Sequence, residues 1–296
     1  MQTAQRVLRR LRKLVEAPPV RDRTVIKIVE RRQQRLAPGF IIGVYRSGTT
    51  LLRYVLDSHS HIAVPPESNY LQALAGFAED PWVRKGFTGI GVDDEGLLRH
   101  LRDFAWGPLD DYAIAKGKQR WFDKTPSYTN ILPFLHQLFG PECRYIMLYR
   151  HGLDVANSMT NGHNSGVIYG PTKAYVTDPG ISPQQGYTRY WVDQCQKMLA
   201  FEAEHPEQCI RIRYEDYAGK PETHLPPMFA AIGEPWEAEV LEFYQKPHDF
   251  GLQDHKISET RGFKPRTGGY RQWPQAEIDA AGDIAAEVLS TLGYPA

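Results

Sequence analysis

The segment GFIIGVYRSGTTLLRYVLD, residues 39–57, constrains the fold more than any other part of the chain. Its apolar start, FIIGVY, is typical of a buried strand, and a turn rich in Gly and Thr and an amphipathic helix follow. Such a strand–turn–helix unit predicts an anion site, because unpaired N–H groups and the positive end of the helix dipole point at the turn. Gly43, Gly48 and Thr50 match the phosphate-loop pattern G-x-x-x-x-G-K-[ST], but Thr49 replaces its lysine.

The turn also carries a cation and several hydroxyl groups. Arg46 precedes Gly48 by two positions, and Ser47, Thr49 and Thr50 add hydroxyl donors. A guanidinium fork with hydroxyl groups suits a tetrahedral oxyanion. A simpler interpretation, in which Gly-Thr-Thr is only a turn and a helix cap, explains fewer of these features.

The expected second strand limits the kind of anion. ATP-dependent phosphoryl transfer uses a loop lysine and Mg²⁺, and an Asp at the end of a neighbouring strand helps to hold the metal. The segment RYIMLYR, residues 144–150, instead ends in Arg150. This arrangement disfavours an NTPase and predicts an anionic ligand that side chains neutralise without a metal.

Composition and charge set further limits. Hydrophobic residues make up 42% of the 296 residues, which is ample for a core, and no run of about 18 apolar residues indicates a membrane span. The three cysteines are widely spaced, which argues against a disulfide framework or a C-x-x-C metal site and suits a reducing compartment. Residues 1–37 hold eleven Lys and Arg against three acidic residues, so this stretch carries +8 and the remainder −8.

The basic stretch is expected to be a helical N-terminal extension, residues 1–38, before a main domain of residues 39–296. One interpretation is an amphipathic helix that packs on its own domain; another is an arm that contacts an anionic partner such as a membrane surface. Apolar residues recur in it at helical spacing: Val7, Leu8, Leu11, Leu14 and Val15.

Strands that alternate with helices predict an α/β fold, a P-loop-like three-layer sandwich with a central, mostly parallel sheet flanked by helices. Strands are expected at 40–45, 120–124, 143–150 and 207–216. Helices are expected at 49–58, 67–79, 94–105, 127–139, 152–159, 184–204, 236–246 and 275–291. Residues 163–183 are expected to form a long, substrate-binding loop.

Three segments in this order resemble the sulfotransferases that use 3′-phosphoadenosine 5′-phosphosulfate (PAPS), closest to the tyrosylprotein type and related bacterial enzymes. They are YRSGTTLLRYVLDSHSHIAVPPES, YIMLYRHGLDVANSM and, more weakly, RYEDY. The similarity spans residues 39–217, with a fainter tail to 272. It implies a PAPS donor, adenosine 3′,5′-bisphosphate (PAP) as product, and no metal.

The resemblance also assigns the donor site. Arg46 and the loop through Ser47, Gly48, Thr49, Thr50 and Leu51 would hold the 5′-phosphosulfate. Arg150 and Ser158 resemble the pair that binds the 3′-phosphate, and Tyr214 would stack on adenine. A C-terminal basic loop would cover the nucleotide, and the candidates within residues 256–273 are Lys264, Arg266 and Arg271.

Two further residues would act in catalysis together with Arg46. Glu67 lies 21 residues beyond Arg46, where the tyrosylprotein enzymes place their catalytic Glu, so the resemblance implies that it is the general base that takes the proton of the acceptor hydroxyl. Alternatively, Glu67 is only an acid in the first turn of a helix. His59 and His61 are the rival candidates for the base. Lys124 would stabilise charge on the leaving phosphate, unless it is only an exposed residue at a strand end.

The acceptor cannot be read from these residues: a small molecule, glycan, lipid or peptide would fit. Its pocket is expected within residues 68–116 and 163–183, with His163, Tyr169 and Tyr175. Two rival functions stay open: a small-molecule kinase with an altered loop, and a non-catalytic nucleotide-binding module with a basic recruiting arm. We expect a cytoplasmic, bacterial enzyme with no nucleic-acid partner. Two further questions are left open: whether residues 1–37 contact a membrane surface, and whether the protein forms a homodimer.

Overall fold

Five parallel strands form the centre of the fold in the computed structural model, which describes residues 37–168, 170–251 and 260–295. The strand order is β2-β3-β1-β4-β5, and β1 and β4 are paired so that Gly43 lies opposite Leu148. The strands are β1 (Gly39–Gly43), β2 (Ile62–Ala63), β3 (Arg120–Asp123), β4 (Arg144–Tyr149) and β5 (Cys209–Arg213). The predicted parallel sheet is therefore confirmed.

Alternate side chains of the strands enter two separate cores, because successive residues of a strand point to opposite faces of the sheet. Phe40 and Ile42 pack into one core, and Ile41 packs into the other. The first core is covered by α3 (Tyr70–Glu79), α5 (Asp94–Ala115), α6 (Leu132–Phe139), α7 (Gly152–Asn164), α9 (Pro183–Glu204) and α12 (Gln275–Thr291). The second is covered by α2 (Thr49–Asp57), α10 (Tyr214–Gly219), α11 (Pro221–Ala231) and the 3-10 helix η3 (Ala238–Gln245).

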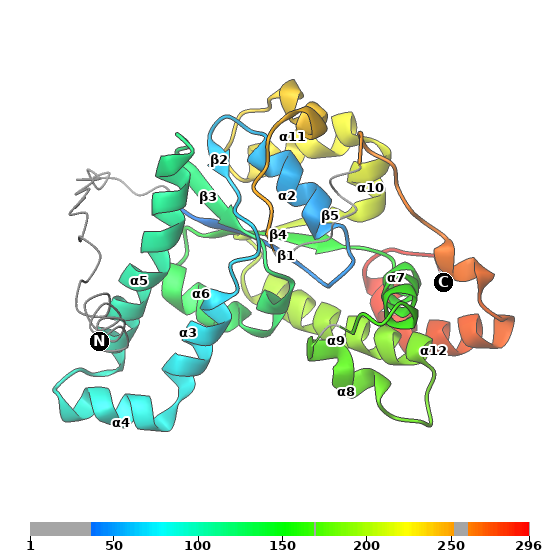
Figure 1. Cartoon of the computed structure of the whole chain (residues 1–296), viewed down its shortest axis with the longest axis horizontal. Coiled ribbons are helices and arrows are strands. Elements are labelled where there is room, and N and C mark those ends of the chain that lie inside the picture. Colours follow the sequence, from blue (N-terminus) through cyan, green and yellow to red (C-terminus); the bar gives the residue numbers. More distant parts are fainter. Residues whose placement is uncertain (1–36, 169, 252–259, 296) are drawn as a thin grey trace, which may run out of the picture. The chain divides into compact units, whose positions relative to one another are not determined.

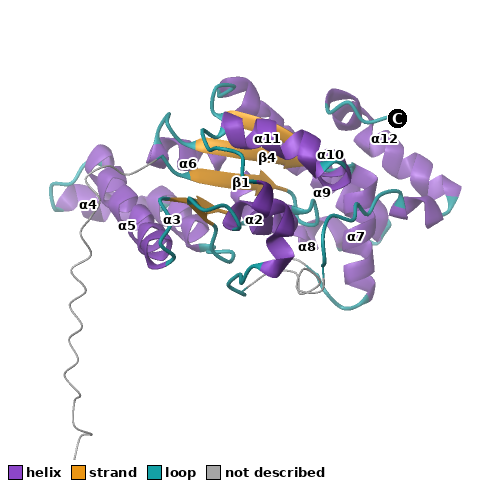
Figure 2. Ribbon diagram, turned by 90° about the horizontal axis from the view of Figure 1, so that it is seen from above, coloured by secondary structure: helices purple, strands orange, loops and turns teal. Residues whose placement is uncertain are grey.

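The predicted three-layer sandwich is thus confirmed. Helices α2, α10 and α11 lie on one side of the strands, and α6, α9 and α12 lie on the other (Figure 1). Seen from above, the strands lie side by side (Figure 2). Smaller elements connect the layers: α4 (Pro81–Gly89), η1 (Pro126–Asn130), η2 (Gly170–Thr172), α8 (Lys173–Val176) and η5 (Gly269–Gln272).

Several predicted boundaries are wrong. The predicted loop at 163–183 is partly helical, since it contains the end of α7 and the short elements η2 and α8. The segment predicted as a helix at 236–246 is a 3-10 helix, with a kink at Glu242. The predicted strand at 207–216 ends at Arg213, and α10 begins there.

Besides α8 and α10, two further helices were not predicted. Helix α4 is short and has no buried residue, and the Asp80 side chain caps it by accepting from the N–H groups of Trp82 and Val83. Helix α11 contains Pro226 and Pro227, which obscure a helical pattern.

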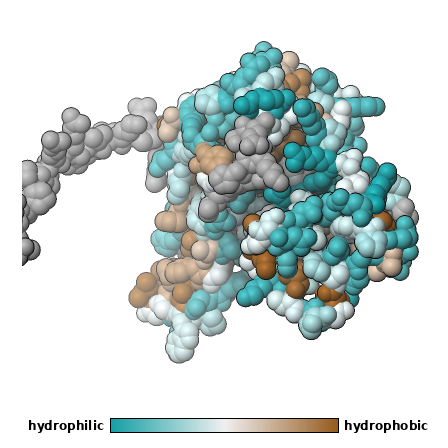
Figure 3. Space-filling model, turned by 45° about the vertical axis from the view of Figure 1, so that its right-hand side comes forward, coloured by the Kyte–Doolittle hydropathy of each residue, from teal (hydrophilic) through white to brown (hydrophobic). Residues whose placement is uncertain are grey.

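The predicted extension of residues 1–38 lies almost entirely outside the described residues. Within the described ranges, no helix is both long enough and apolar enough to cross a bilayer. Hydrophilic side chains predominate on the face shown in Figure 3, and apolar ones form separate patches.

Candidate active site

The predicted site residues lie where strands of the sheet end. Arg46 follows β1, Lys124 follows β3, Arg150 follows β4 and Tyr214 follows β5. All four strands are parallel, so their carboxyl ends meet at one edge of the sheet. The strands β2 and β3, which follow β1 in the chain, lie on one side of it, and β4 and β5 lie on the other, so the strand order reverses at β1. Ligands of open α/β sheets bind at such a switch point.

The turn after β1 is shaped for an anion. The backbone of Arg46 has φ 70°, and Gly48 has φ 95°. Helix α2 begins at Thr49, so the N–H groups of Thr49 and Thr50 have no partner within the helix. Its first turn holds no acidic residue and its N-cap makes no side-chain hydrogen bond. The turn can therefore present backbone N–H groups and the positive end of the helix dipole to a ligand.

Only glycine fits at position 48. A Cβ atom there would lie 2.4 Å from Cδ2 of Tyr214, and the positive φ disfavours any side chain. The hydroxyl of Tyr217 donates to the Gly48 carbonyl at 2.9 Å, which fixes the turn from behind. The turn and the start of α10 are therefore packed in direct contact.

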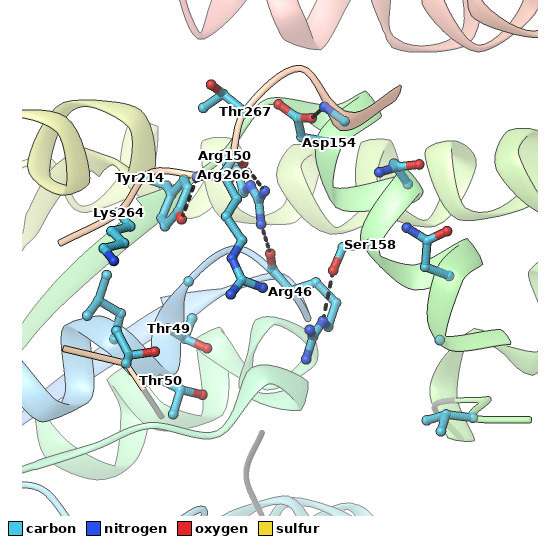
Figure 4. Close-up of a pocket in the computed structure, with 18 of the residues that line it drawn as sticks. Arg46, Thr49, Thr50, Arg150, Asp154, Ser158, Tyr214, Lys264, Arg266 and Thr267 are labelled. Atoms are coloured by element: carbon cyan, nitrogen blue, oxygen red, sulfur yellow. Dashed lines mark hydrogen bonds between the residues drawn. The ribbon is translucent and has the colours of Figure 1, made fainter. Parts of the chain in front are cut away.

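Arg150 connects three parts of the site. Its guanidinium donates to the carbonyl oxygens of Arg46 at 2.8 Å and of Arg266 at 2.5 Å (Figure 4). It also lies 4.5 Å from the centroid of the Tyr214 ring, within range of a cation–π interaction. Its Nε is buried without a hydrogen-bond partner among the described residues. A guanidinium has five N–H groups, and these two hydrogen bonds use two of them.

Helix α7 forms the wall opposite the turn. Ser158, predicted to lie beside a phosphate, accepts a hydrogen bond from Nε of Arg46 at 3.1 Å. One turn earlier, Asp154 accepts hydrogen bonds from the N–H groups of Gly268 and Gly269 at 2.9 and 2.8 Å. The C-terminal basic segment is thus attached to α7 as well as to Arg150.

These elements enclose a cavity of about 1080 Å³ (Figure 4). Most of the predicted donor-site residues line it: Arg46, Gly48, Thr49, Thr50, Leu51, Arg150, Ser158, Tyr214, Lys264 and Arg266. Arg261 adds a fifth cation, whereas Asp154 is the one carboxylate in this lining as far as the structure describes it. Since both Asp154 oxygens accept backbone N–H groups, the charge of the cavity favours an anion.

Four predicted site residues do not line this cavity. Ser47 is fully buried, so its hydroxyl does not reach the ligand space. Arg271 lies in η5, beyond the segment that faces the cavity. Glu67 and Lys124 lie at the end of β3, where they contact each other.

Tyr214 lines the cavity but also supports its neighbours. Its ring packs against Gly48 and carries the Arg150 guanidinium, and its hydroxyl accepts the N–H of Arg266 at 3.1 Å. This packing favours a supporting role over the predicted stacking on adenine.

Glu67 and Lys124 form an ion pair, with Oε1 and Nζ 2.5 Å apart. The Lys124 side chain is fully buried and that of Glu67 is 15% exposed. Burial lowers the pKa of Lys124, and the nearby Glu67 carboxylate partly offsets this effect.

Two alternative interpretations of this pair are therefore wrong. Lys124 is not an exposed residue at a strand end, because its side chain is buried. Glu67 is not in the first turn of a helix, because α3 begins at Tyr70.

His59, one of the rival bases, is buried and holds two backbone segments together. Its Nδ1 accepts from the N–H of His61 at 3.1 Å, so Nε2 carries the proton and donates to the carbonyl of Pro235 at 2.9 Å. His61 contacts Glu234 at 3.1 Å. Among the described residues, His59, His61 and Glu234 are the one group of three whose possible metal-ligand atoms lie within 4.8 Å of one another. Both nitrogens of His59 are already used, which disfavours a metal site there.

Arg53 is a functional candidate that the sequence analysis missed. It is fully buried, and its Nε donates to the carbonyl oxygens of Val64 and Pro65 at 3.0 and 2.8 Å. It therefore fixes the segment that leads to Glu67. The available signal was an arginine within the apolar stretch LLRYVL of an otherwise buried helix.

A parallel sheet with an anion-binding turn at its switch point defines an α/β protein of the P-loop-like class. The model of the sulfotransferase family matches residues 38–238. This match covers most of the chain, and the protein belongs to the sulfotransferase family.

Known proteins with similar sequences agree with this assignment. Protein-tyrosine sulfotransferase 1 of Danio rerio is 24% identical over 265 residues, which cover 86% of this chain and 71% of that protein. Nodulation protein NoeE of Sinorhizobium fredii is 36% identical over 127 residues, but these cover only 40% of this chain and 30% of NoeE. A sulfotransferase domain from the curacin biosynthetic pathway has a similar structure, with a TM-score of 0.63 at 23% identity over 88% of this chain and 99% of that domain.

Proposed function

We propose that this sulfotransferase moves the sulfuryl group of PAPS to an acceptor hydroxyl or amine, with Glu67 as general base. One observation carries the proposal: the turn at Arg46 and the guanidinium of Arg150 face a single cavity and contact each other. PAPS is anionic at both ends of its nucleoside, so a protein that binds it needs two such cation clusters within reach of one ligand.

The residues of the cavity fit this donor. Backbone N–H groups of Thr49 and Thr50, with the Arg46 side chain, suit the 5′-phosphosulfate. Arg150 and Ser158, which both line the cavity, suit the 3′-phosphate. A cavity of about 1080 Å³ is large for a single small ligand, which leaves room for the nucleotide and part of an acceptor.

The chemistry needs a base and a cation, and the ion pair at β3 supplies both. When the acceptor oxygen attacks sulfur, an O–S bond forms and the bond between sulfur and the phosphate oxygen breaks. The hydroxyl proton passes to the Glu67 carboxylate. Lys124 holds Glu67 in place, and its ammonium would stabilise charge that develops on the leaving phosphate.

At the ends of the two strands that flank β1, the structure offers no suitable metal ligand for the rival kinase function. A magnesium-dependent phosphate loop needs a carboxylate at the end of a neighbouring strand. β4 is followed by Arg150, and β3 ends at Asp123, whose side chain is fully buried and accepts hydrogen bonds from Ser68 and Tyr128. Asp123 is therefore not available to a metal in the cavity.

Titration calorimetry tests the donor assignment. We expect PAP to bind in the presence of EDTA and ATP with Mg²⁺ to bind at least about tenfold more weakly, because the site neutralises two separate phosphates with side chains. Tight binding of ATP with Mg²⁺ and none of PAP would overturn the donor assignment in favour of a kinase.

Transfer of ³⁵S from labelled PAPS tests the base. Because several relatives are protein-tyrosine sulfotransferases, a tyrosyl peptide is the first acceptor to try, before sugars and fatty alcohols. Glu67→Gln should reduce transfer by about 10² to 10⁴-fold with the Kd for PAP unchanged. Glu202→Gln is the matched control, because Glu202 is also a largely buried carboxylate in an ion pair, with Arg211, but lies on α9 outside the cavity lining. Full activity of Glu67→Gln would remove Glu67 from the role of base.

A further inference from the structure

Two neighbouring residues of the segment after β2 contact two neighbouring residues at the end of β3. Glu67 pairs with Lys124 at 2.5 Å, and the Ser68 hydroxyl donates to Oδ2 of Asp123, also at 2.5 Å. The segment that carries the proposed base is thus attached to the sheet at consecutive positions. One of these attachments holds the carboxylate and the other holds the backbone beside it.

Asp123 is the anchor of the second attachment. It is fully buried and accepts hydrogen bonds from the hydroxyls of Ser68 and Tyr128, the latter at 3.1 Å. The two hydroxyls are also 2.9 Å apart, so the three groups form a closed triangle. Burial raises the pKa of Asp123 to about 6, although the two hydrogen bonds favour its ionised form. A buried carboxyl is costly, and an apolar residue would serve the core at least as well.

The residue after Ser68 completes the attachment. Asn69 has a backbone φ of 57°, and its side-chain amide donates to the carbonyl of Glu67 at 3.1 Å. Its own N–H points to the hydroxyl of Thr125 at 3.5 Å, the next residue of the β3 end. On the other side, Arg53 holds the carbonyls of residues 64 and 65. The base therefore lies on a loop whose backbone is fixed from both directions.

We propose that Asp123 is a positioning residue for sulfuryl transfer: through Ser68 it fixes the backbone of Glu67, so that the carboxylate meets Lys124 and the acceptor at one place. Asp123 is fully buried, whereas the Glu67 side chain is 15% exposed, so Asp123 acts through Glu67 and not on the substrates. This inference rests on the proposed role of Glu67 as base. A base on a loop needs such support, because displacement by about 1 Å can cost about 10²-fold in rate.

Asp123→Asn keeps the size of the side chain but weakens the triangle, because both hydroxyls donate to Oδ2 and a neutral amide oxygen is a weaker acceptor there than a carboxylate oxygen. We expect kcat to fall by about 10 to 100-fold, with the KM for PAPS and the Kd for PAP unchanged. Ser68→Ala should have the same effect, and Ser68→Thr, which keeps the hydroxyl, should restore most of the activity. Ser68 is only partly buried, so the alanine variant remains informative if Asp123→Asn does not fold. Glu202→Gln again serves as control.

A double-mutant cycle separates positioning from general destabilisation. If Asp123 acts through Glu67, then Asp123→Asn should cause no further loss of single-turnover ³⁵S transfer in the Glu67→Gln background. Amide hydrogen exchange at residues 66–70 should also rise in Asp123→Asn and Ser68→Ala, and this measurement requires no acceptor.

The outcomes distinguish the two proposals. If Glu67→Gln is fully active, the proposed base is wrong. If Glu67→Gln is inactive while Ser68→Ala and Asp123→Asn match the wild type in kcat and in exchange at 66–70, the positioning role is wrong. Additive losses in the double variant would likewise show that Asp123 is structural only.

Discussion

Replacement of Gly48 by alanine tests how the donor site is built. Its added Cβ would lie 2.4 Å from Cδ2 of Tyr214, so the ring or the turn has to move. Alanine at a φ of 95° also costs about 1 kcal/mol in backbone energy wherever it occurs. We therefore expect two separate effects, one on stability and one on donor binding.

The effect on donor binding follows from the contacts of Tyr214. Moving the ring weakens its cation–π interaction with Arg150, which is worth about 1 kcal/mol, and its hydrogen bond from the N–H of Arg266, worth about another 1 kcal/mol. If these contacts have to be restored when PAP binds, binding loses about 2 kcal/mol. The Kd for PAP should then rise by about 30-fold, since 1.4 kcal/mol corresponds to a factor of ten.

Gly91→Ala is the matched control. Gly91 has a φ of 85°, and no heavy atom lies within 4 Å of its ideal Cβ position. The Gly91→Ala variant should also lose about 1 kcal/mol of unfolding free energy, seen as a fall in Tm of roughly 2–4 °C, but it should bind PAP like the wild type. Titration calorimetry and differential scanning calorimetry check both variants. Wild-type affinity in Gly48→Ala would refute the close packing of the turn against Tyr214.

Other parts of the site give three further predictions. Arg150→Ala should weaken PAPS at least about tenfold more than adenosine 5′-phosphosulfate in competition binding, because only PAPS has a 3′-phosphate; equal losses would remove Arg150 from that site. The stability that Asp123 provides should fall as pH rises from about 4 to 6, by on the order of 3 kcal/mol, because the unfolded carboxyl loses its proton there while the folded one, with a pKa of about 6, retains it. Urea unfolding at several pH values should show that the difference in unfolding free energy between Asp123→Asn and wild type changes over this pH range. A difference that does not change with pH would contradict the prediction. Finally, EDTA should leave ³⁵S transfer unchanged, whereas loss of transfer that Mg²⁺ restores would show a metal-dependent reaction.

The local chemistry of residues 39–57 was sufficient to predict the centre of the fold. The strand, the turn and the helix were all found near their predicted positions, because a β-branched stretch, a glycine at positive φ and an apolar helical face each leave a strong local signal. The same is true of the strand that ends before Arg150. Its parallel pairing with β1 agrees with the parallel sheet that alternating strands and helices predict.

The remaining parts of the site depend on contacts between distant segments. No pattern around Arg53 shows that its side chain reaches the carbonyls of residues 64 and 65, and none around Asp123 shows that Ser68 donates to it. The burial of Ser47 and the position of Arg271 outside the cavity also follow from tertiary packing. Sequence spacing indicated which residue types belong to the site, whereas packing decided which of them reach the cavity.

The attachment of Gly268 and Gly269 to Asp154 has a consequence for biosynthesis. The phosphate-binding turn leaves the ribosome about 220 residues before these glycines do. The last strand, β5, ends about 55 residues before Gly268, so at about 5–20 residues per second the nascent chain spends roughly 3–11 s with the sheet edge made but its nucleotide cover still untranslated. During that interval the cation-rich edge is open to any cellular polyanion, and a truncated product that stops before residue 266 would keep the sheet yet lack a closed donor pocket.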